Sequence, residues 1–145
     1  MTPRRLTLAA ALAAALLAPA GAALAQNLDL QRPHKVVFQV SDGDAAKWNL
    51  ALNNARNVQQ DLGRDNVAIE IVAYGPGIGM LKMDSVVAAR VGEAIKGGVA
   101  VVACENTMKN QKLTRDDMLA PIGYVEAGVV ELMKRQREGF AYVRP

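Results

Sequence analysis

Short apolar segments alternate with amphipathic ones along residues 34–145, and this alternation restricts the fold more than any other property of the sequence. The apolar segments are rich in β-branched residues, which is typical of strands, and the segments between them repeat apolar residues at helical spacing. We therefore predict five strands, at 34–40, 67–74, 99–104, 122–125 and 140–143. We also predict helices over 45–62, 85–96, 105–112 and 127–138, with the start of one more at 114–117.

The composition of the middle strands indicates where they lie. Residues 67–74 and 99–104 are mostly apolar on both faces, as are strands of a parallel sheet that helices cover on both sides. The longest helix carries one apolar stripe that we expect to be buried, formed by Trp48, Ala51, Leu52, Ala55, Val58 and Leu62. The predicted fold is a three-layer α/β/α sandwich with a five-stranded, mainly parallel sheet.

The first 25 residues have the pattern of a secretory signal peptide. Arg4 and Arg5 form a basic start, residues 6–17 are almost all Ala and Leu, and 23–25 provide an Ala-x-Ala cleavage site. We predict a cleaved signal at 1–25 that ends at Ala25, a flexible lead-in at 26–33, and a single domain at 34–145. Export places the mature protein in an oxidising compartment, which is the periplasm in a bacterium. The twin arginines are compatible with Tat export, but the residues that follow them fit Sec export better.

The charge of the mature chain is nearly balanced. The full sequence has 17 basic and 14 acidic side chains, and removal of Arg4 and Arg5 leaves 15 against 14. The chain has neither a basic patch nor the interleaved aromatic residues that nucleic-acid binding requires. No later apolar stretch of the sequence is long enough to span a bilayer, so we expect no membrane association after cleavage.

Cys104 is the single cysteine of the chain, and it ends the third predicted strand just before a predicted helix. Ligands of parallel sheets bind beyond the carboxyl ends of the strands. The loops that follow the predicted strands are 41–44, 75–80, 104–108 and 126–128. Amide groups and the dipole at a helix amino end stabilise an anion, and they would lower the pKa of the thiol. The carboxylate of Glu105 opposes this effect, whereas Lys109 and Lys112 would support it if they fold back. A buried structural cysteine is an equally weighted alternative.

Other patterns exclude several chemistries. His34, the only histidine, begins the first strand and so lies at the end of the sheet opposite Cys104, which argues against a Cys–His dyad. The absence of Cys-x-x-Cys excludes dithiol exchange within one chain. The glycines at 75, 77 and 79 match neither the dinucleotide-binding nor the P-loop pattern and predict a tight turn. One Cys and one His provide no zinc set, and we predict no metal and no cofactor.

The segment Gly98–Met108, with Cys-x-Asn-Thr-Met at its end, resembles the cysteine segment of the DsrE/DsrF-like proteins. Similar matches occur at the opening strand 34–40, the strand and loop 72–77, and the ending 139–145. The resemblance covers nearly the whole mature chain and is strongest to the exported, stand-alone branch of that family. It implies a five-stranded parallel sheet flanked by helices, and a homo-oligomer that is a trimer or a hexamer.

The resemblance also implies a role for the cysteine. In the sulfur-relay members of the family, a cysteine in the matching loop carries sulfur as a persulfide and passes it to a partner thiol. Carried over to this chain, that cysteine is Cys104. The residues expected around it, as pocket walls or groups that stabilise the thiolate, are Glu105, Asn106, Thr107, Met108, Gly75 and Gly77. The sulfur-relay members act in the cytoplasm beside dedicated partner subunits, so the sulfur donor or acceptor protein of an exported chain is unknown.

Three functions remain open from the sequence. The leading hypothesis is an exported sulfur carrier or thiol-binding protein that uses Cys104 in persulfide relay, and it is a carrier rather than a turnover enzyme. The alternative is a non-catalytic, oligomeric module that binds a small ligand, with Cys104 only lining the pocket. A third hypothesis is a one-cysteine peroxide reductase that cycles through a sulfenic acid.

Overall fold

The computed structural model describes residues 29–145, and the predicted signal segment 1–25 lies outside the described residues. A five-stranded, all-parallel sheet with the strand order β4-β3-β2-β1-β5 forms its centre. The strands are β1 (His34–Val40), β2 (Val67–Ala73), β3 (Ala100–Cys104), β4 (Gly123–Val125) and β5 (Ala141–Val143). Each predicted strand is present, and the predicted parallel sheet is confirmed.

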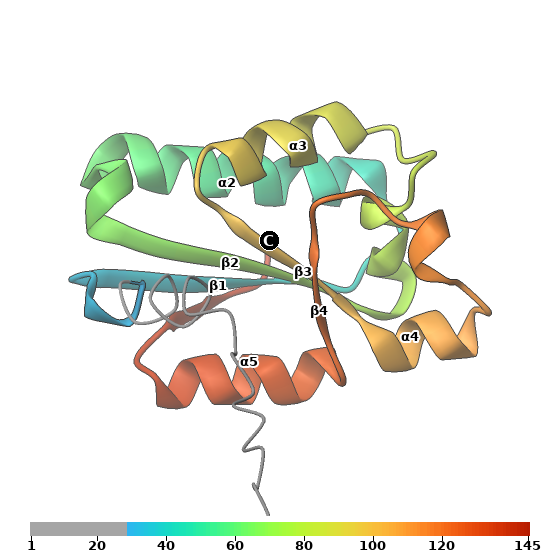
Figure 1. Ribbon diagram of the computed structural model, residues 1–145. Coiled ribbons are helices and arrows are strands. Elements are labelled where there is room, and N and C mark those ends of the chain that lie inside the picture. The colour runs from blue at the N-terminus through green and yellow to red at the C-terminus, as the bar shows by residue number, and fades with distance from the viewer. Residues whose placement is uncertain (1–28) are drawn as a thin grey trace, which may run out of the picture.

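Helices cover both faces of the sheet. The α-helices are α2 (Ala45–Leu62), α3 (Ala88–Lys96), α4 (Glu105–Asn110) and α5 (Gly128–Arg137). Three 3-10 helices join them: η1 (Arg64–Asn66), η2 (Gly75–Leu81) and η3 (Arg115–Asp117). The helices α2 and α3 lie side by side over one face, and α5 lies over the other (Figure 1). The predicted α/β/α sandwich is therefore confirmed.

Some local predictions were wrong. The segment predicted as a loop at 75–79 is the start of η2, because Pro76 at its amino end favours a helical turn. The helix predicted from Ser85 begins only at Ala88, so Val86 lies in a turn and is 80% exposed. The helical start predicted at 114–117 is a single 3-10 turn closed by a capping box between Thr114 and Asp117. Leu62, predicted to be buried, lies at the end of α2 and is exposed.

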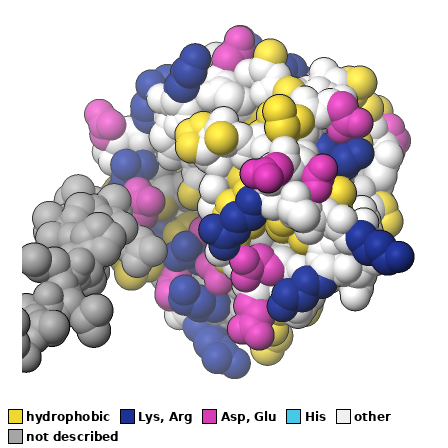
Figure 2. All heavy atoms as spheres, turned by 45° about the vertical axis from the view of Figure 1, so that its right-hand side comes forward, with side chains coloured by type: hydrophobic (Ala, Val, Ile, Leu, Met, Phe, Trp, Pro, Cys, Tyr) yellow, Lys and Arg dark blue, Asp and Glu magenta, His cyan; other side chains and the backbone are white. Residues whose placement is uncertain are grey.

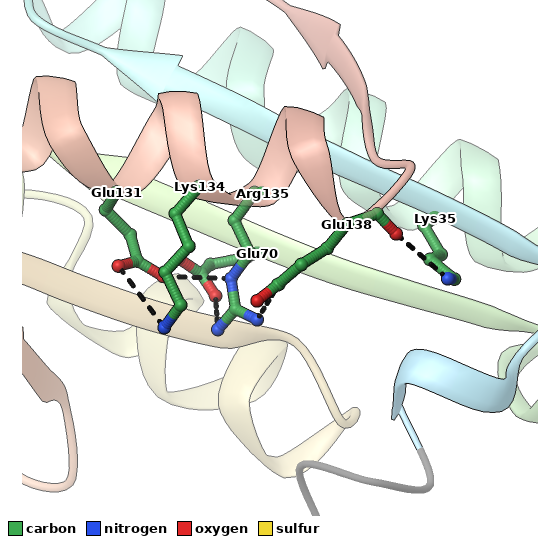
Figure 3. Close-up of polar contacts among 6 residues, drawn as sticks. All are labelled: Lys35, Glu70, Glu131, Lys134, Arg135 and Glu138. Atoms are coloured by element: carbon green, nitrogen blue, oxygen red, sulfur yellow. Dashed lines mark hydrogen bonds and ion pairs between the residues drawn. The ribbon is translucent and has the colours of Figure 1, made fainter.

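The two faces of the sheet differ in what they bury. The face under α2 and α3 holds the large apolar core, to which Phe38, Ile71 and Leu52 belong. The face under α5 holds a smaller apolar cluster of Val37, Ala68, Val72, Leu132 and Phe140. Beside this cluster, Arg135 on α5 pairs with Glu70 on β2 and with Glu131 and Glu138 of its own helix and cap, and Figure 3 shows the carboxylates gathered around its guanidinium.

The connections diverge at the carboxyl ends of β2 and β3. The chain leaves β2 through η2 toward α3, on the side of the sheet that carries α2 (Figure 1). The chain leaves β3 through α4, which lies toward the side of α5 (Figure 1). A crevice between diverging connections is where open parallel sheets bind ligands. A ligand site is therefore expected at this edge of the sheet, where Cys104 ends β3.

The last residues of the predicted lead-in contact the domain. Residues 29–31 are helical, and Arg32 forms an ion pair with Asp29. The Nη1 of Arg32 donates to the backbone carbonyl oxygens of Val67, at 2.7 Å, and Arg64, at 3.3 Å. These contacts attach the chain before β1 to the start of β2.

Candidate functional site

Cys104 lies where three elements meet. It is the last residue of β3 and the N-cap of α4, and its side chain points toward the amino end of α5. The strand register explains the direction, because side chains alternate across a sheet and Val102, two residues earlier, packs against the cluster under α5. Only 5% of the residue is exposed. The thiol therefore lies just beneath the surface, between the amino ends of two helices.

Backbone amides surround the sulfur. The N–H of Thr107 donates to Sγ at 3.5 Å, and the thiol itself points at the carbonyl oxygen of Glu126, 3.8 Å away. Burial raises the pKa of Cys104, but hydrogen bonds from the side chain and the amide of Thr107 and from the amides of Gly128 and Asn106 outweigh it, so the pKa is lowered. Amides of both α4 and α5 thus favour the thiolate.

A close packing contact leaves no space for a side chain at Gly128. A Cβ at this position would lie 2.9 Å from the Cβ and Cδ1 atoms of Tyr74, which is closer than such atoms approach. The absence of a side chain lets the first residue of α5 pack against the Tyr74 side chain, with its amide directed at Cys104. The loop 126–128 was singled out from the sequence, but no residue of it was predicted as a site residue.

Thr107 links the loops that follow β2 and β3. Its Oγ1 accepts a hydrogen bond of 2.9 Å from the amide of Gly75, at the start of η2. The side chain of Gln111, just after α4, donates to the carbonyl oxygen of Gly75 at 3.3 Å. The predicted site residue Gly75 therefore acts through Thr107, by holding the residue that donates to the sulfur.

The remaining predicted site residues lie elsewhere. The carboxylate of Glu105 pairs with Arg115 at 3.0 Å on the outside of the domain. Met108, predicted to line the thiol pocket, is buried in the large core on the α2 side of the sheet. Gly77, another predicted site residue, packs against the end of β1, where a Cβ would meet the carbonyl oxygen of Val40. His34 begins β1, at the opposite end of the sheet from Cys104, as predicted.

Tyr74 connects the thiol site to polar residues at the ends of other strands. Burial raises the pKa of Tyr74, and the nearby Tyr142 and Cys104 raise it further, while Arg144 lowers it. The hydroxyl of Tyr142 donates to Oε1 of Gln39 at 2.6 Å. Tyr74 follows β2, whereas Tyr142 and Gln39 come from β5 and from β1 beside it, so the sheet order brings the two tyrosines together. Sequence reasoning missed them, because no spacing along the chain indicates this neighbourhood.

A hollow opens at the surface beside the thiol. It has a volume of about 320 Å³ and is lined by Asn106, Val125, Glu126, Ala127, Val130 and Glu131. Asn106 and Glu126 border Cys104, and Glu131 belongs to the ion cluster under α5. The hollow therefore reaches from the rim of the thiol site to the charged layer.

Over the part of the chain that the structure describes, other kinds of site are not found. Within residues 29–145, no three His, Cys, Asp or Glu side chains are grouped so that they could hold a metal ion. No helix in this range has both the length and the apolar character needed to cross a membrane. On the side that carries α4, basic and acidic side chains are interspersed rather than collected into one basic surface (Figure 2).

The chain is similar to a solved structure from an archaeon. A protein of unknown function from Methanobacterium thermoautotrophicum, MTH1491, shares 38% identity with it at a TM-score of 0.74, over 77% of this chain and 99% of that protein. A conserved protein of unknown function from Bacteroides thetaiotaomicron, BT1422, shares the fold at 15% identity and a TM-score of 0.62, over 77% and 94% of the two chains. A scan against models of protein families and a search of curated proteins found no match.

Proposed function

Because the chain belongs to the same family as the Methanobacterium thermoautotrophicum protein, whose own function is unknown, we propose a function from the thiol site itself. The protein is a sulfur carrier that accepts and passes on sulfane sulfur at Cys104. One observation carries the proposal: the sulfur lies between the amino ends of α4 and α5, where amides of both helices lower the pKa of the thiol. The resemblance to the DsrE/DsrF-like proteins supports the same role.

The chemistry needs one nucleophilic thiolate and no second cysteine. The Cys104 thiolate attacks the outer sulfur of a donor persulfide, R–S–SH, and a new S–S bond forms on Sγ. The S–S bond of the donor breaks, and the donor leaves as the thiolate R–S⁻. The product at Cys104 is a persulfide that keeps the proton of the donor's outer sulfur. The sulfur atom is exchanged without net oxidation or reduction, so no cofactor is required.

Space for the added sulfur is available next to the site. A second sulfur atom extends the side chain by about 2 Å. The hollow that borders Asn106 and Glu126 lies beside the thiol, and Asn106 and Glu126 are exposed. Their movement would open a path from the hollow to Sγ. In this proposal Thr107 and Gly128 stabilise the thiolate of Cys104 before it attacks the donor. They stabilise the same thiolate again when Cys104 passes the sulfur to an acceptor and becomes the leaving group.

The test is an intact-mass measurement. The protein is incubated with polysulfide, or with thiosulfate and a sulfurtransferase. Its intact mass is then measured by mass spectrometry with and without a reductant. We expect the gain of one sulfur atom, reversed by the reductant and absent from the Cys104→Ser variant. Failure to form this adduct, together with slow alkylation of Cys104 at neutral pH, would contradict the proposal. An adduct that forms only with peroxide would indicate a sulfenic acid instead.

A second candidate function is supported by the burial of the thiol. With 5% of Cys104 exposed, the residue can serve as one wall of a small-ligand site that involves the hollow. In that case the protein is a binding module, and Cys104→Ser would leave ligand affinity unchanged. A lower affinity in Val130→Asp, which changes the lining of the hollow, would favour this function over sulfur transfer.

Export and assembly are part of the same proposal. We propose that residues 1–25 direct export to the periplasm and that the mature chain, which begins at Gln26, assembles into a trimer or a hexamer. Amino-terminal sequencing of protein from a periplasmic fraction tests the first point. Light scattering of the purified mature chain tests the second, and a monomer at all concentrations would contradict it.

A further inference from the structure

A second groove lies far from Cys104, between α2 and α3. It has a volume of about 170 Å³ and is lined by Leu52, Ala55, Arg56, Gln59, Arg64, Arg90, Glu93, Ala94, Gly97 and Val99. Val99 comes just before β3, so the groove lies near the amino ends of the strands, whereas Cys104 ends β3 at the opposite edge. The sulfur-carrier proposal makes no use of this groove.

Three arginines on the rim give the groove an excess of positive charge. Arg56 comes from α2, Arg64 from η1 and Arg90 from α3, and Glu93 is the one acidic residue among those that line it. Within residues 29–145, none of the three arginines forms an ion pair with a carboxylate. Most of their charge is therefore not neutralised by the described part of the protein.

Arg90 is held in place without being neutralised. Its Nη1 donates to Oδ1 of Asn49, and its Nη2 donates to Oδ1 of Asn53 at 2.6 Å. Both acceptors are neutral amide oxygens on α2. They fix the direction of the guanidinium and use two of its five N–H groups, and within residues 29–145 its side chain donates to no other acceptor. An oriented cation binds an anion with a smaller loss of conformational entropy than a mobile side chain does.

The helix ends that adjoin the groove weaken its positive field but do not cancel it. α2 and α3 both end near the groove, at Leu62 and Lys96. A helix carboxyl end has a partial charge of about half an electron. Two such ends offset on the order of one unit of charge, whereas three arginines and one glutamate leave an excess of two.

The floor of the groove is apolar. Leu52, Ala55 and Val99 belong to the large core, and Ala94 packs against it. Gln59 donates to the carbonyl oxygen of Gly97 at 2.8 Å, which leaves its own side-chain oxygen as an acceptor at the edge. An apolar floor beneath a cationic rim is complementary to a molecule with a short hydrocarbon part and one anionic group.

We propose that the groove between α2 and α3 binds a small amphipathic oxyanion, a carboxylate or a phosphate monoester with a short apolar chain. Arg90 and Arg56, on facing helices, and Arg64 contact the anionic group. The apolar part of the ligand lies on Leu52, Ala94 and Val99. The phosphate and carboxylate forms share this recognition, and separate titrations distinguish between them.

Isothermal titration of the protein with hexyl phosphate, hexanoate, inorganic phosphate and hexanol tests the proposal. We expect saturable binding of hexyl phosphate, hexanoate or both, weaker binding of inorganic phosphate, and no binding of hexanol. The double variant Arg56→Gln, Arg64→Gln should lower the affinity for the hexyl compounds at least tenfold, because it removes charge-assisted hydrogen bonds to the anionic group. Arg90→Gln should do the same, and its far-ultraviolet circular dichroism checks that it folds.

Matched variants separate this site from nonspecific attraction and from the thiol site. Arg137→Gln changes an exposed arginine on α5, and Cys104→Ser removes the thiol, so neither should alter the affinity. The proposal is overturned if neither hexyl compound saturates, if the arginine variants of the groove bind normally, or if Arg137→Gln loses as much affinity as they do. Equal affinity for inorganic phosphate and hexyl phosphate would overturn the role of the apolar floor.

Discussion

The helical layer formed by α2 and α3 contacts the sheet through apolar side chains, whereas α5 adds a cluster of charged contacts to a smaller apolar one. α2 buries Ala51, Leu52 and Ala55 against the sheet, and α3 buries Val91. α5 instead places Glu131 and Arg135 next to Glu70, an acidic residue in the middle of β2 (Figure 3). One domain therefore combines two means of attachment that respond differently to pH.

The ion cluster has more carboxylates than it can pair well. Arg135 lies 2.6 Å from Glu70, 2.9 Å from Glu131 and 2.9 Å from Glu138. Among the described residues, Lys134 approaches only Glu131, at 4.0 Å, and Oε1 of Glu70 has no hydrogen-bond partner. Burial raises the pKa of Glu70 to about 7, because Arg135 lowers it too little to compensate while its charge is shared among three acids, and Glu131 raises it further.

The thiol site depends on the layer that is held by charge. Gly128 begins α5, and its amide helps to lower the pKa of Cys104. The same helix is held by the ion cluster at Glu131 and Arg135, one and two turns further along. The layer that completes the thiol site is thus the layer whose attachment depends on charge, whereas the apolar layer only supports the sheet.

The largest expected effect is that of Arg135→Met. This change removes the cation that Glu70, Glu131 and Glu138 share beneath α5. Removal of one partner of a buried ion pair lowers the free energy of unfolding by about 3–5 kcal/mol. Urea unfolding at pH 8 measures the loss, which should shrink at pH 5 because Glu70 then holds a proton. Arg137→Met, on the exposed side of the same helix, should change stability by less than about 0.5 kcal/mol. Equal losses in both variants would show that the cluster does not hold α5.

The next largest effect is the pH dependence that Glu70 contributes. In the unfolded chain its carboxyl loses a proton near 4.5, but in the folded protein it does so near 7, so the native state holds the extra proton between these values. The free energy of unfolding should therefore fall by on the order of 3 kcal/mol as the pH rises from 4.5 to 7, and it should level off above pH 7. Glu70→Gln should remove this component from urea-unfolding energies measured between pH 4.5 and 8. Asp61→Asn, an exposed change on α2, should keep it.

A smaller and pH-independent effect is expected on the apolar side. Ile71 is fully buried in the core under α2 and α3. Ile71→Val removes one methylene group and should lower the free energy of unfolding by about 1 kcal/mol at both pH 5 and pH 8. A loss that changes with pH by more than the fitting error would contradict the separation of the two layers.

The smallest effect on stability, but one with a chemical readout, is that of Thr107→Val. The substitution removes a hydrogen bond that lowers the pKa of Cys104, so the thiolate fraction at pH 7 should fall. Alkylation by iodoacetamide should slow several-fold at pH 7 and approach the wild-type rate at high pH. Thr114→Val, which changes the capping box of η3, is the matched control. An unchanged rate at pH 7 would mean that Thr107 does not act on the sulfur.

The sequence by itself determined the layers and the place of Cys104. Apolar runs of β-branched residues, separated by helical spacing, require a parallel sheet covered on both sides, because only such a sheet buries both faces of its central strands. The end of the run 99–104 then places the thiol at the carboxyl edge. These conclusions depend on local periodicity, which the sequence displays directly.

Only the tertiary structure decided what surrounds the thiol and how α5 is held. Gly128 and Tyr74 are distant in the chain and meet because α5 folds back over β2. Glu70 lies within a run that reads as a buried apolar strand, and nothing near it in the sequence identifies Arg135 as its partner. Met108 follows Cys104 closely, yet the turn of α4 directs it into the opposite core. Such contacts depend on strand order and helix rotation, which arise from packing over the whole domain rather than from local pattern.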